Sequence, residues 1–201
     1  MTTSLPSRIV LLDRSASLVG AWERAFEDYE AVDAIEGDFF SEPADAMVSP
    51  ANRFGIMDGG LDLAIRDALG FEVEKRAQRC ILARHHGELP VGQAEIVATD
   101  QARWPFLVIA ATMRVPESVA RTTNAYLAFR VVLLAVRRFN EASPERRIDS
   151  LVCPGLGTGI GGMAPERCAL QMRMAYRQVT GPARVPSFNR IHAIHAALVR
   201  A

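Results

Sequence analysis

Lysine and cysteine are scarce in this chain of 201 residues. Lys75 is the only lysine and lies in a charged, helix-like stretch, so chemistry that needs a lysine nucleophile or a Schiff base is disfavoured. The three cysteines are far apart and form no C-x-x-C pair, which argues against both a disulfide framework and a zinc ribbon. We expect each of them to be a buried thiol: Cys80, Cys153 and Cys168.

Long apolar runs and net charge are also lacking. No apolar run approaches the ~20 residues needed to cross a bilayer, and residues 1–15 have neither the basic nor the apolar region of a signal peptide. The formal net charge is +0, so nothing in the overall charge favours nucleic acid or a membrane as partner. These absences predict a mature cytoplasmic protein. One asymmetry is that arginines but no acids follow Glu166, which indicates either a phosphate-attracting face or, as we favour, an ordinary helical surface.

Hydrophobic residues make up 49% of the sequence and charged residues 23%, values typical of one globular domain spanning residues 1–201. Apolar, β-branched runs predict strands within residues 8–13, 31–38, 44–51, 93–100, 104–113 and 148–155. Helical spacing of apolar residues predicts helices within residues 15–29, 59–70, 71–86, 122–142, 164–181 and 191–200. Strands that alternate with helices predict an α/β fold, with helices on both faces of a largely parallel or mixed sheet.

Two glycine-rich loops each follow a predicted strand and precede a predicted helix. We call "VSPANRFGIMDGG", residues 48–60, the first glycine loop and "PGLGTGIGG", residues 154–162, the second glycine loop. Ligands of open α/β sheets collect at the carboxyl ends of the strands, where helix N-termini present free N–H groups and a partial positive charge. The two loops can therefore line one crevice and hold a phosphate or diphosphate. Simple tight turns are the alternative, and the glycines alone do not decide between the two.

The second glycine loop formally matches the dinucleotide fingerprint G-x-G-x-x-G at Gly157, Gly159 and Gly162. Its context argues against that assignment, because it comes late in the chain and no acid lies about 20 residues downstream to hold a ribose. The phosphate-binding Walker pattern is excluded as well, since no lysine follows the glycines. What remains is a backbone cradle for an anion.

Polar side chains accompany the first glycine loop. The amide of Asn52 could hold a sugar hydroxyl, and the carboxylate of Asp62 could accept a hydrogen bond from a hydroxyl or orient a water molecule. Helix capping is the alternative for both, and Asp38 could likewise cap a turn or accept from an amino group of a base. We expect no metal site, because His192 and His195 share a helix face without a third ligand.

Several motifs together resemble the macro domain family. The matching segments are "EGDFF", "ADAMVSPAN", "GGLDLAI", "LPVGQAEIVAT" and "VCPGLGTGIGGMAPERCA". They follow the family's order over about residues 35–176, whereas the predicted strand and helix at the N-terminus precede the first motif. The resemblance implies a three-layer α/β/α sandwich around a mixed, largely parallel sheet, with ADP-ribose as the ligand and no cofactor.

The resemblance also implies residue roles. Asp38 would accept from the adenine amino group, Asn52 would hold the distal ribose, and Asp62 would take the place of the acid that binds that ribose or activates water. The glycine loops would wrap the diphosphate. The implied catalytic residues are Asn52 and Asp62, and the implied ligand-binding residues are Asp38, Phe39, Asp58, Gly59, Gly60, Gly157, Thr158, Gly159, Ile160 and Gly161.

Two positions depart from the family pattern. Ser49 stands where the family commonly has an Asn, and Asp58 replaces one glycine of the first loop. An added carboxylate should repel a diphosphate unless it points away or serves as a second catalytic acid. The implied activity is hydrolysis of ADP-ribose conjugates, on acidic protein side chains or on small acyl groups. The alternatives are a non-catalytic reader of ADP-ribose or a related nucleotide, and a phosphatase acting on the 1″-phosphate of ADP-ribose. The implied partner is ADP-ribose or an ADP-ribosylated protein.

Overall fold

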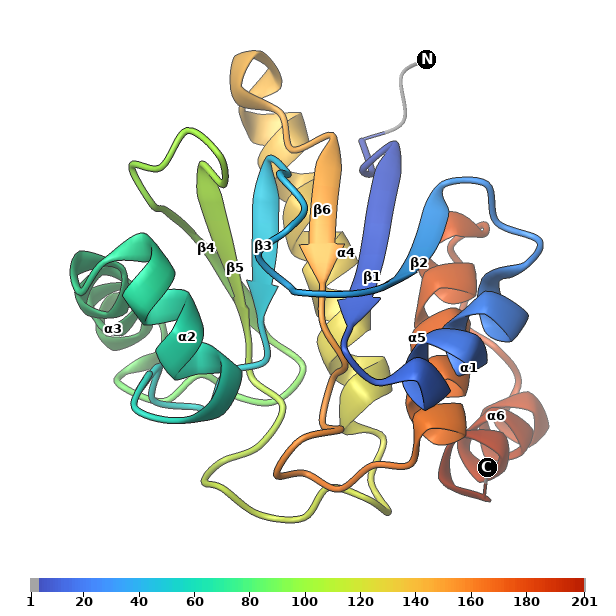
Figure 1. Ribbon diagram of the computed structural model, residues 1–201. Helices are drawn as coiled ribbons and strands as arrows, with labels where there is room; N and C mark the ends of the chain where they lie inside the picture. Colours follow the sequence, from blue (N-terminus) through green and yellow to red (C-terminus); the bar gives the residue numbers. More distant parts are fainter. Residues whose placement is uncertain (1–3, 201) are drawn as a thin grey trace.

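A sheet of six strands lies at the centre of the fold, in the order β2-β1-β6-β3-β5-β4 (Figure 1). The computed structural model describes residues 4–200. Neighbouring strands are parallel except for β4 and β5, which pair antiparallel. The prediction of a mixed, largely parallel sheet is therefore confirmed. The strands are β1 (Arg8–Asp13), β2 (Val32–Glu36), β3 (Ala46–Ser49), β4 (Ala94–Ala98), β5 (Phe106–Ala110) and β6 (Ser150–Cys153).

Helices cover both faces of this sheet. They are α1 (Ala16–Phe26), α2 (Gly60–Leu69), α3 (Glu72–His85), α4 (Asn124–Ala142), α5 (Pro165–Thr180) and α6 (Phe188–Arg200), with a short 3-10 helix η1 (Pro144–Arg146). Alternate strand residues supply two cores: Ile9 and Leu11 pack with residues of α1, α4 and α5, whereas Val10 and Leu12 pack with residues of α2 and α3. This burial on both faces explains why the strands read as continuous apolar runs. The three-layer sandwich is confirmed.

Local signals in the sequence set several helix ends. The Ser15 side chain accepts a hydrogen bond from the Leu18 N–H at 3.4 Å and so caps α1, and Pro165 occupies the first turn of α5. Gly70 ends α2 with a φ of 91°, a backbone conformation that residues other than glycine rarely adopt. The last helix begins earlier than predicted, at Phe188, because the backbone of Ser187 accepts the first helical hydrogen bond from Ile191 at 2.9 Å.

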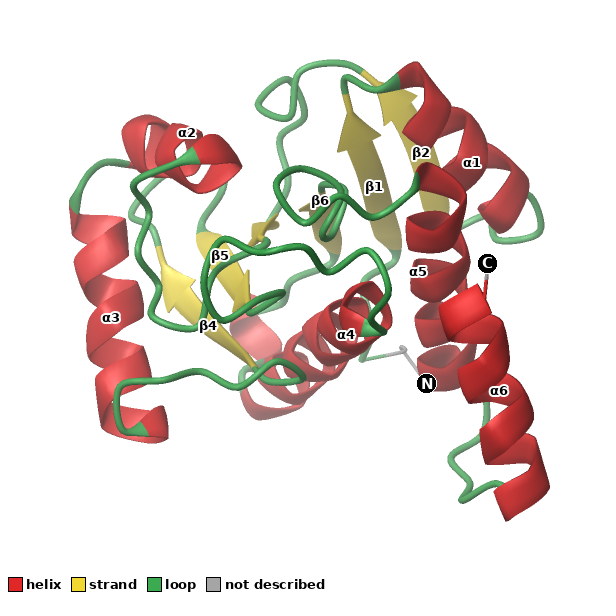
Figure 2. Cartoon of the chain, turned by 90° about the horizontal axis from the view of Figure 1, so that it is seen from below, coloured by secondary structure: helices red, strands yellow, loops and turns green. Residues whose placement is uncertain are grey.

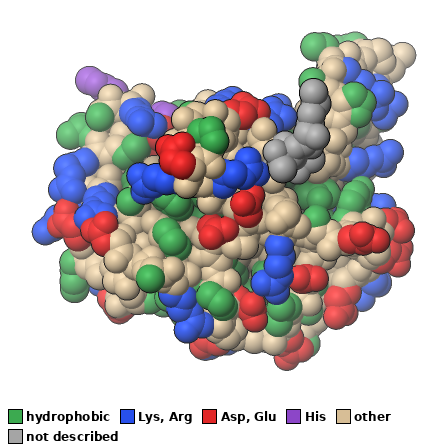
Figure 3. Space-filling model, turned by 90° about the horizontal axis from the view of Figure 1, so that it is seen from above, with side chains coloured by type: hydrophobic (Ala, Val, Ile, Leu, Met, Phe, Trp, Pro, Cys, Tyr) green, Lys and Arg blue, Asp and Glu red, His purple; other side chains and the backbone are tan. Residues whose placement is uncertain are grey.

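Surface properties agree with the balanced composition. Acidic and basic side chains are interspersed on the face of the molecule seen from above (Figure 3). Within residues 4–200, no helix is long and apolar enough to cross a membrane.

The topology brings the two glycine loops together. β3 and β6 are adjacent parallel strands, so the loops that leave their carboxyl ends emerge side by side. β1 flanks β6 and β5 flanks β3 in the same direction, so Asp13 and the segment after Ala110 reach this edge as well. Figure 2 looks onto this edge, where the long connections lie between the helices. Ligands bind at this position in open α/β sheets.

Candidate functional site

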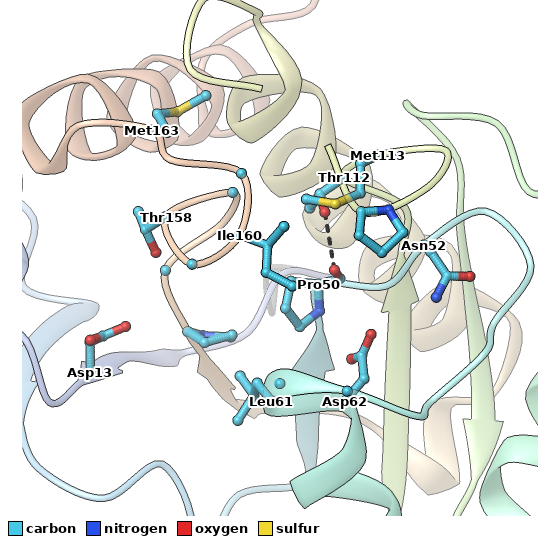
Figure 4. Close-up of a pocket in the computed structure, with 18 of the residues that line it drawn as sticks. Asp13, Pro50, Asn52, Leu61, Asp62, Thr112, Met113, Thr158, Ile160 and Met163 are labelled. Carbon is cyan, nitrogen blue, oxygen red and sulfur yellow. Dashed lines mark hydrogen bonds between the residues drawn. The ribbon is translucent and has the colours of Figure 1, made fainter. Parts of the chain in front are cut away.

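A cleft of about 410 Å³ opens at the carboxyl edge of the sheet, between the two glycine loops (Figure 4). The structure therefore brings the two loops into one site, as their order in the sequence predicted. All predicted site residues except Asp38 and Phe39 line this cleft: Asn52, Asp58, Gly59, Gly60, Asp62, Gly157, Thr158, Gly159, Ile160 and Gly161.

Asp62 is one of the titratable groups that line the cleft. It lies in the first turn of α2, and its Oδ1 accepts a hydrogen bond of 2.6 Å from the Ser49 hydroxyl at the end of β3. Burial raises the pKa of Asp62 from 3.8 to about 6, although the hydrogen bond from Ser49 acts in the opposite direction. Such a carboxyl is mostly ionised at neutral pH and still exchanges protons readily, which suits acid–base chemistry.

Asn52 lies beside Asp62, but its amide organises the first glycine loop. Its Oδ1 accepts hydrogen bonds from the backbone N–H groups of Phe54 at 3.0 Å and Ile56 at 3.3 Å. Its Nδ2 donates to the Ile56 carbonyl at 2.7 Å. The side chain therefore fixes the turn that leads to Asp58, and in this conformation only the remaining amide hydrogen is left for a ligand.

Backbone hydrogen bonds hold the second glycine loop in one shape. The Gly157 carbonyl accepts from the Met163 N–H at 3.0 Å, and the Gly161 carbonyl accepts from the Val119 N–H at 2.8 Å. A Cβ atom at Gly161 would lie 2.4 Å from the Gly157 oxygen, so the loop requires glycine there. By contrast, a Cβ at Gly159 would meet nothing within 4 Å, because this residue borders the open cleft.

The loops offer hydrogen-bond donors rather than cations. Within residues 4–200, no group accepts a hydrogen bond from the backbone N–H groups of residues 158–161. Gly59 precedes α2 without a side-chain cap, and no group among the described residues accepts from the N–H groups of Gly60, Leu61 and Asp62 at the start of that helix. Together they form a cradle for an anion.

The ionisable side chains of the cleft are all acidic. Asp13, Asp58 and Asp62 line it, and its lining within the described chain contains no Lys, Arg or His. None of the arginines that follow Glu166 and have described side chains lines the cleft. An anionic ligand in this cleft would be held by backbone N–H groups and the α2 dipole, against the repulsion of nearby carboxylates.

Asp38 and Phe39 lie elsewhere. Asp38 pairs with Arg14, and its Oδ1 accepts from the Phe40 N–H at 2.9 Å. The hydrogen bond from the Phe40 N–H lowers the pKa of Asp38 below its usual value, and the hydrogen bond from Arg14 makes a smaller contribution in the same direction. Phe39 is only 6% exposed and packs in the core on the α2 and α3 side of the sheet. Neither residue is among those that line the cleft, and the base contact that the resemblance implies for Asp38 stays a prediction.

Known proteins similar to this chain identify its family. A family model for the Macro domain matches residues 48–172. This chain belongs to the macro domain family. The family prediction is therefore confirmed, and the match covers both glycine loops and α2.

Two relatives have sequences similar to that of this macro domain. An uncharacterized protein of Aeropyrum pernix is 32% identical over 139 residues, which cover 69% of this chain and 67% of the relative. An uncharacterized protein of Aquifex aeolicus is 27% identical over 141 residues, which cover 70% of this chain and 78% of the relative. Neither description names an activity.

Solved macrodomain structures share the fold. The macrodomain of Mycobacterium tuberculosis DarG superimposes with a TM-score of 0.59 at 21% identity, covering 72% of this chain and 89% of that one. A mutant macrodomain of Oceanobacillus iheyensis with ADPR superimposes with a TM-score of 0.55 at 22% identity, covering 70% of this chain and 74% of that one. Thermosipho africanus DarTG in complex with ADP-ribose superimposes with a TM-score of 0.53 at 15% identity, covering 82% of this chain and 50% of that one.

The structure adds site residues that sequence reasoning missed. Asp13, Ser15 and Leu18 of the N-terminal segment line the cleft of this macro domain, although they precede the recognised motifs. The Asp13 Oδ1 accepts from the Ser15 N–H at 2.9 Å, which fixes the turn between β1 and α1. An acid at the carboxyl end of a predicted buried strand was a usable signal, since ligands collect at that position.

The segment after β5 was missed as well. Thr112 and Met113 line the cleft, and the Thr112 hydroxyl donates to the Pro50 carbonyl at 3.0 Å, which ties this segment to the first glycine loop (Figure 4). The sequence carried no comparable signal here, because both residues end an apolar run that was predicted to be strand.

Proposed function

We propose that this macro domain binds ADP-ribose in the cleft and hydrolyses ADP-ribosyl conjugates, with Asp62 as the group that orients and deprotonates water. The observation that carries the proposal is the Asp62 carboxyl, whose pKa is raised to about 6 beside a cradle of unpartnered N–H groups. The relatives of known structure with ADPR or ADP-ribose bound support the choice of ligand.

The cleft offers binding groups for both the diphosphate and the distal ribose of ADP-ribose. Its volume of about 410 Å³ falls in the usual range for small-molecule sites. The diphosphate would accept hydrogen bonds from the N–H groups of residues 158–161 and from the N-terminus of α2. The distal ribose would then lie toward Asn52 and Asp62.

Asp62 then provides the proton transfer. Its carboxylate accepts a proton from the water that attacks at the distal ribose or its ester, and the departing oxygen receives a proton in turn. The products are free ADP-ribose and the released carboxylic acid. The fixed N–H groups would preorganise the substrate for this attack.

Recognition without turnover is the second candidate function. The observation that favours it is the Asn52 amide, which is already engaged with its own loop and offers little to a sugar. A phosphatase is less consistent with the site, because three carboxylates and no basic side chain line the described cleft, and they would repel a terminal phosphate dianion.

Titration with ADP-ribose tests the binding step. A concentration near 100 Kd should raise the free energy of unfolding by about 2.7 kcal/mol, which is measurable as a higher melting temperature. Absence of any shift at millimolar ADP-ribose would contradict the proposal.

Turnover is tested with a protein that is mono-ADP-ribosylated on glutamate. Asp62→Ala should slow release of ADP-ribose by about 100-fold or more while ADP-ribose still protects the fold. The matched control is Asp67→Ala on the same helix, because Asp67 is exposed, does not line the cleft and should leave the rate unchanged. Binding by the natural sequence without any product would identify a reader instead.

A further inference from the structure

Ser49 is buried directly behind Asp62. It ends β3, is only 1% exposed and is not among the residues that line the cleft. Its hydroxyl donates to the Asp62 Oδ1 at 2.6 Å, which links the central sheet to the first turn of α2. A ligand in the cleft would therefore meet Asp62 and not Ser49.

The hydrogen bond leaves one carboxyl oxygen of Asp62 available. Within residues 4–200, no group donates to the Asp62 Oδ2, so Ser49 holds one oxygen while the other remains available to the cleft. A hydroxyl that donates to a carboxyl oxygen favours its ionised form, because the carboxylate is the stronger acceptor. This effect opposes the burial that favours the neutral form.

The charged groups around Asp62 do not replace this contribution. Asp58 on the preceding loop and Asp13 across the cleft are acidic. Arg66, one turn further along α2, lies 3.5 Å from a carboxylate oxygen of Asp67 and 3.6 Å from one of Glu74. Ser49 is therefore the donor that favours the ionised form of Asp62.

We propose that Ser49 is a positioning residue that acts through Asp62. Its hydroxyl fixes the orientation of the carboxyl group and maintains it as an acceptor for a ligand hydroxyl or a water proton. The inference rests on the proposed role of Asp62. It also gives a physical role to the serine found where the family commonly has an Asn.

The first test needs no ligand. In the full chain with ¹³C-labelled aspartate, we expect Ser49→Ala to raise the midpoint of the Asp62 carboxyl titration by about one pH unit. Ser49→Thr, which keeps the hydroxyl, should restore it. The matched control is Ser150→Ala, because the Ser150 hydroxyl donates to the Asp45 Oδ2 at 2.8 Å in a serine–aspartate pair outside the cleft. An unchanged midpoint in Ser49→Ala would overturn the proposal.

The second test is a double-mutant cycle of Ser49→Ala and Asp62→Ala, read as ADP-ribose affinity and as kcat and KM separately. If Ser49 acts through Asp62, Ser49→Ala changes these quantities in the natural sequence and changes none of them in the Asp62→Ala background, where the acceptor of the Ser49 hydroxyl is absent. An equal loss in both backgrounds would overturn the proposal, since it would show a direct or purely structural role. Failure of the natural sequence to bind ADP-ribose would refute the proposed function instead, and the titration without ligand would still decide the role of Ser49.

Discussion

Asp62→Asn should stabilise this macro domain, because the raised pKa of Asp62 shows that its ionised form is disfavoured in the folded state. The pKa rises from 3.8 to about 6, and about 1.36 kcal/mol per pH unit gives about 3 kcal/mol. Asparagine has nearly the same shape, can still accept from the Ser49 hydroxyl and carries no charge. The substitution should therefore raise the free energy of unfolding by about 3 kcal/mol at pH 7.5.

The increase in the free energy of unfolding that Asp62→Asn causes should become smaller as the pH falls. The folded state binds the Asp62 proton more tightly than the unfolded chain, so ionisation lowers the stability of the natural sequence as pH rises from 3.8 to about 6. The destabilisation is complete above the folded pKa and disappears below the unfolded one. At pH 4.5 the advantage of Asp62→Asn should have fallen to about 1 kcal/mol.

Urea unfolding at the two pH values measures this difference. The chain has two tryptophans, Trp22 and Trp104, and both are buried, so their fluorescence reports global unfolding. The exposed Asp67→Asn on the same helix serves as the control and should change stability little at either pH. A gain that is equal at both pH values, or no gain at all, would refute the linkage between Asp62 burial and stability.

Three further outcomes follow from the site. If Asp62 is the base, kcat should fall as pH drops below about 6, which a pH–rate profile will show, and a flat profile would exclude that role. Gly159→Ala should lower ADP-ribose affinity and leave the melting temperature unchanged, because its Cβ would enter the open cleft. Gly161→Ala should lower both the affinity and the melting temperature, because its Cβ would lie 2.4 Å from a backbone oxygen. Asp13→Asn should change ADP-ribose affinity in calorimetry, since Asp13 lines the cleft, and an unchanged affinity would place the ligand away from Asp13.

The sequence by itself determined the elements and the loops. Helical and strand periodicities located the secondary structure because side-chain spacing reflects which face is buried, and Ser15, Gly70 and Pro165 marked helix ends through local backbone chemistry. The two glycine loops were recognisable for the same reason, since strand, glycines and helix follow one another in the chain. Their motifs also sufficed to predict the family, which the Macro domain match confirms.

Only the tertiary structure decided what surrounds each acid. The insertion of β1 between β2 and β6 brings Asp13 to the cleft, while Asp38 pairs with Arg14 outside it. The contact between Ser49 and Asp62 joins residues of a strand and a helix, and the raised pKa of Asp62 results from its burial in the folded chain. Strand order and burial depend on long-range packing, which no local pattern encodes, so the sequence could name Asp58 and Asp62 but neither Asp13 nor the surroundings of these acids.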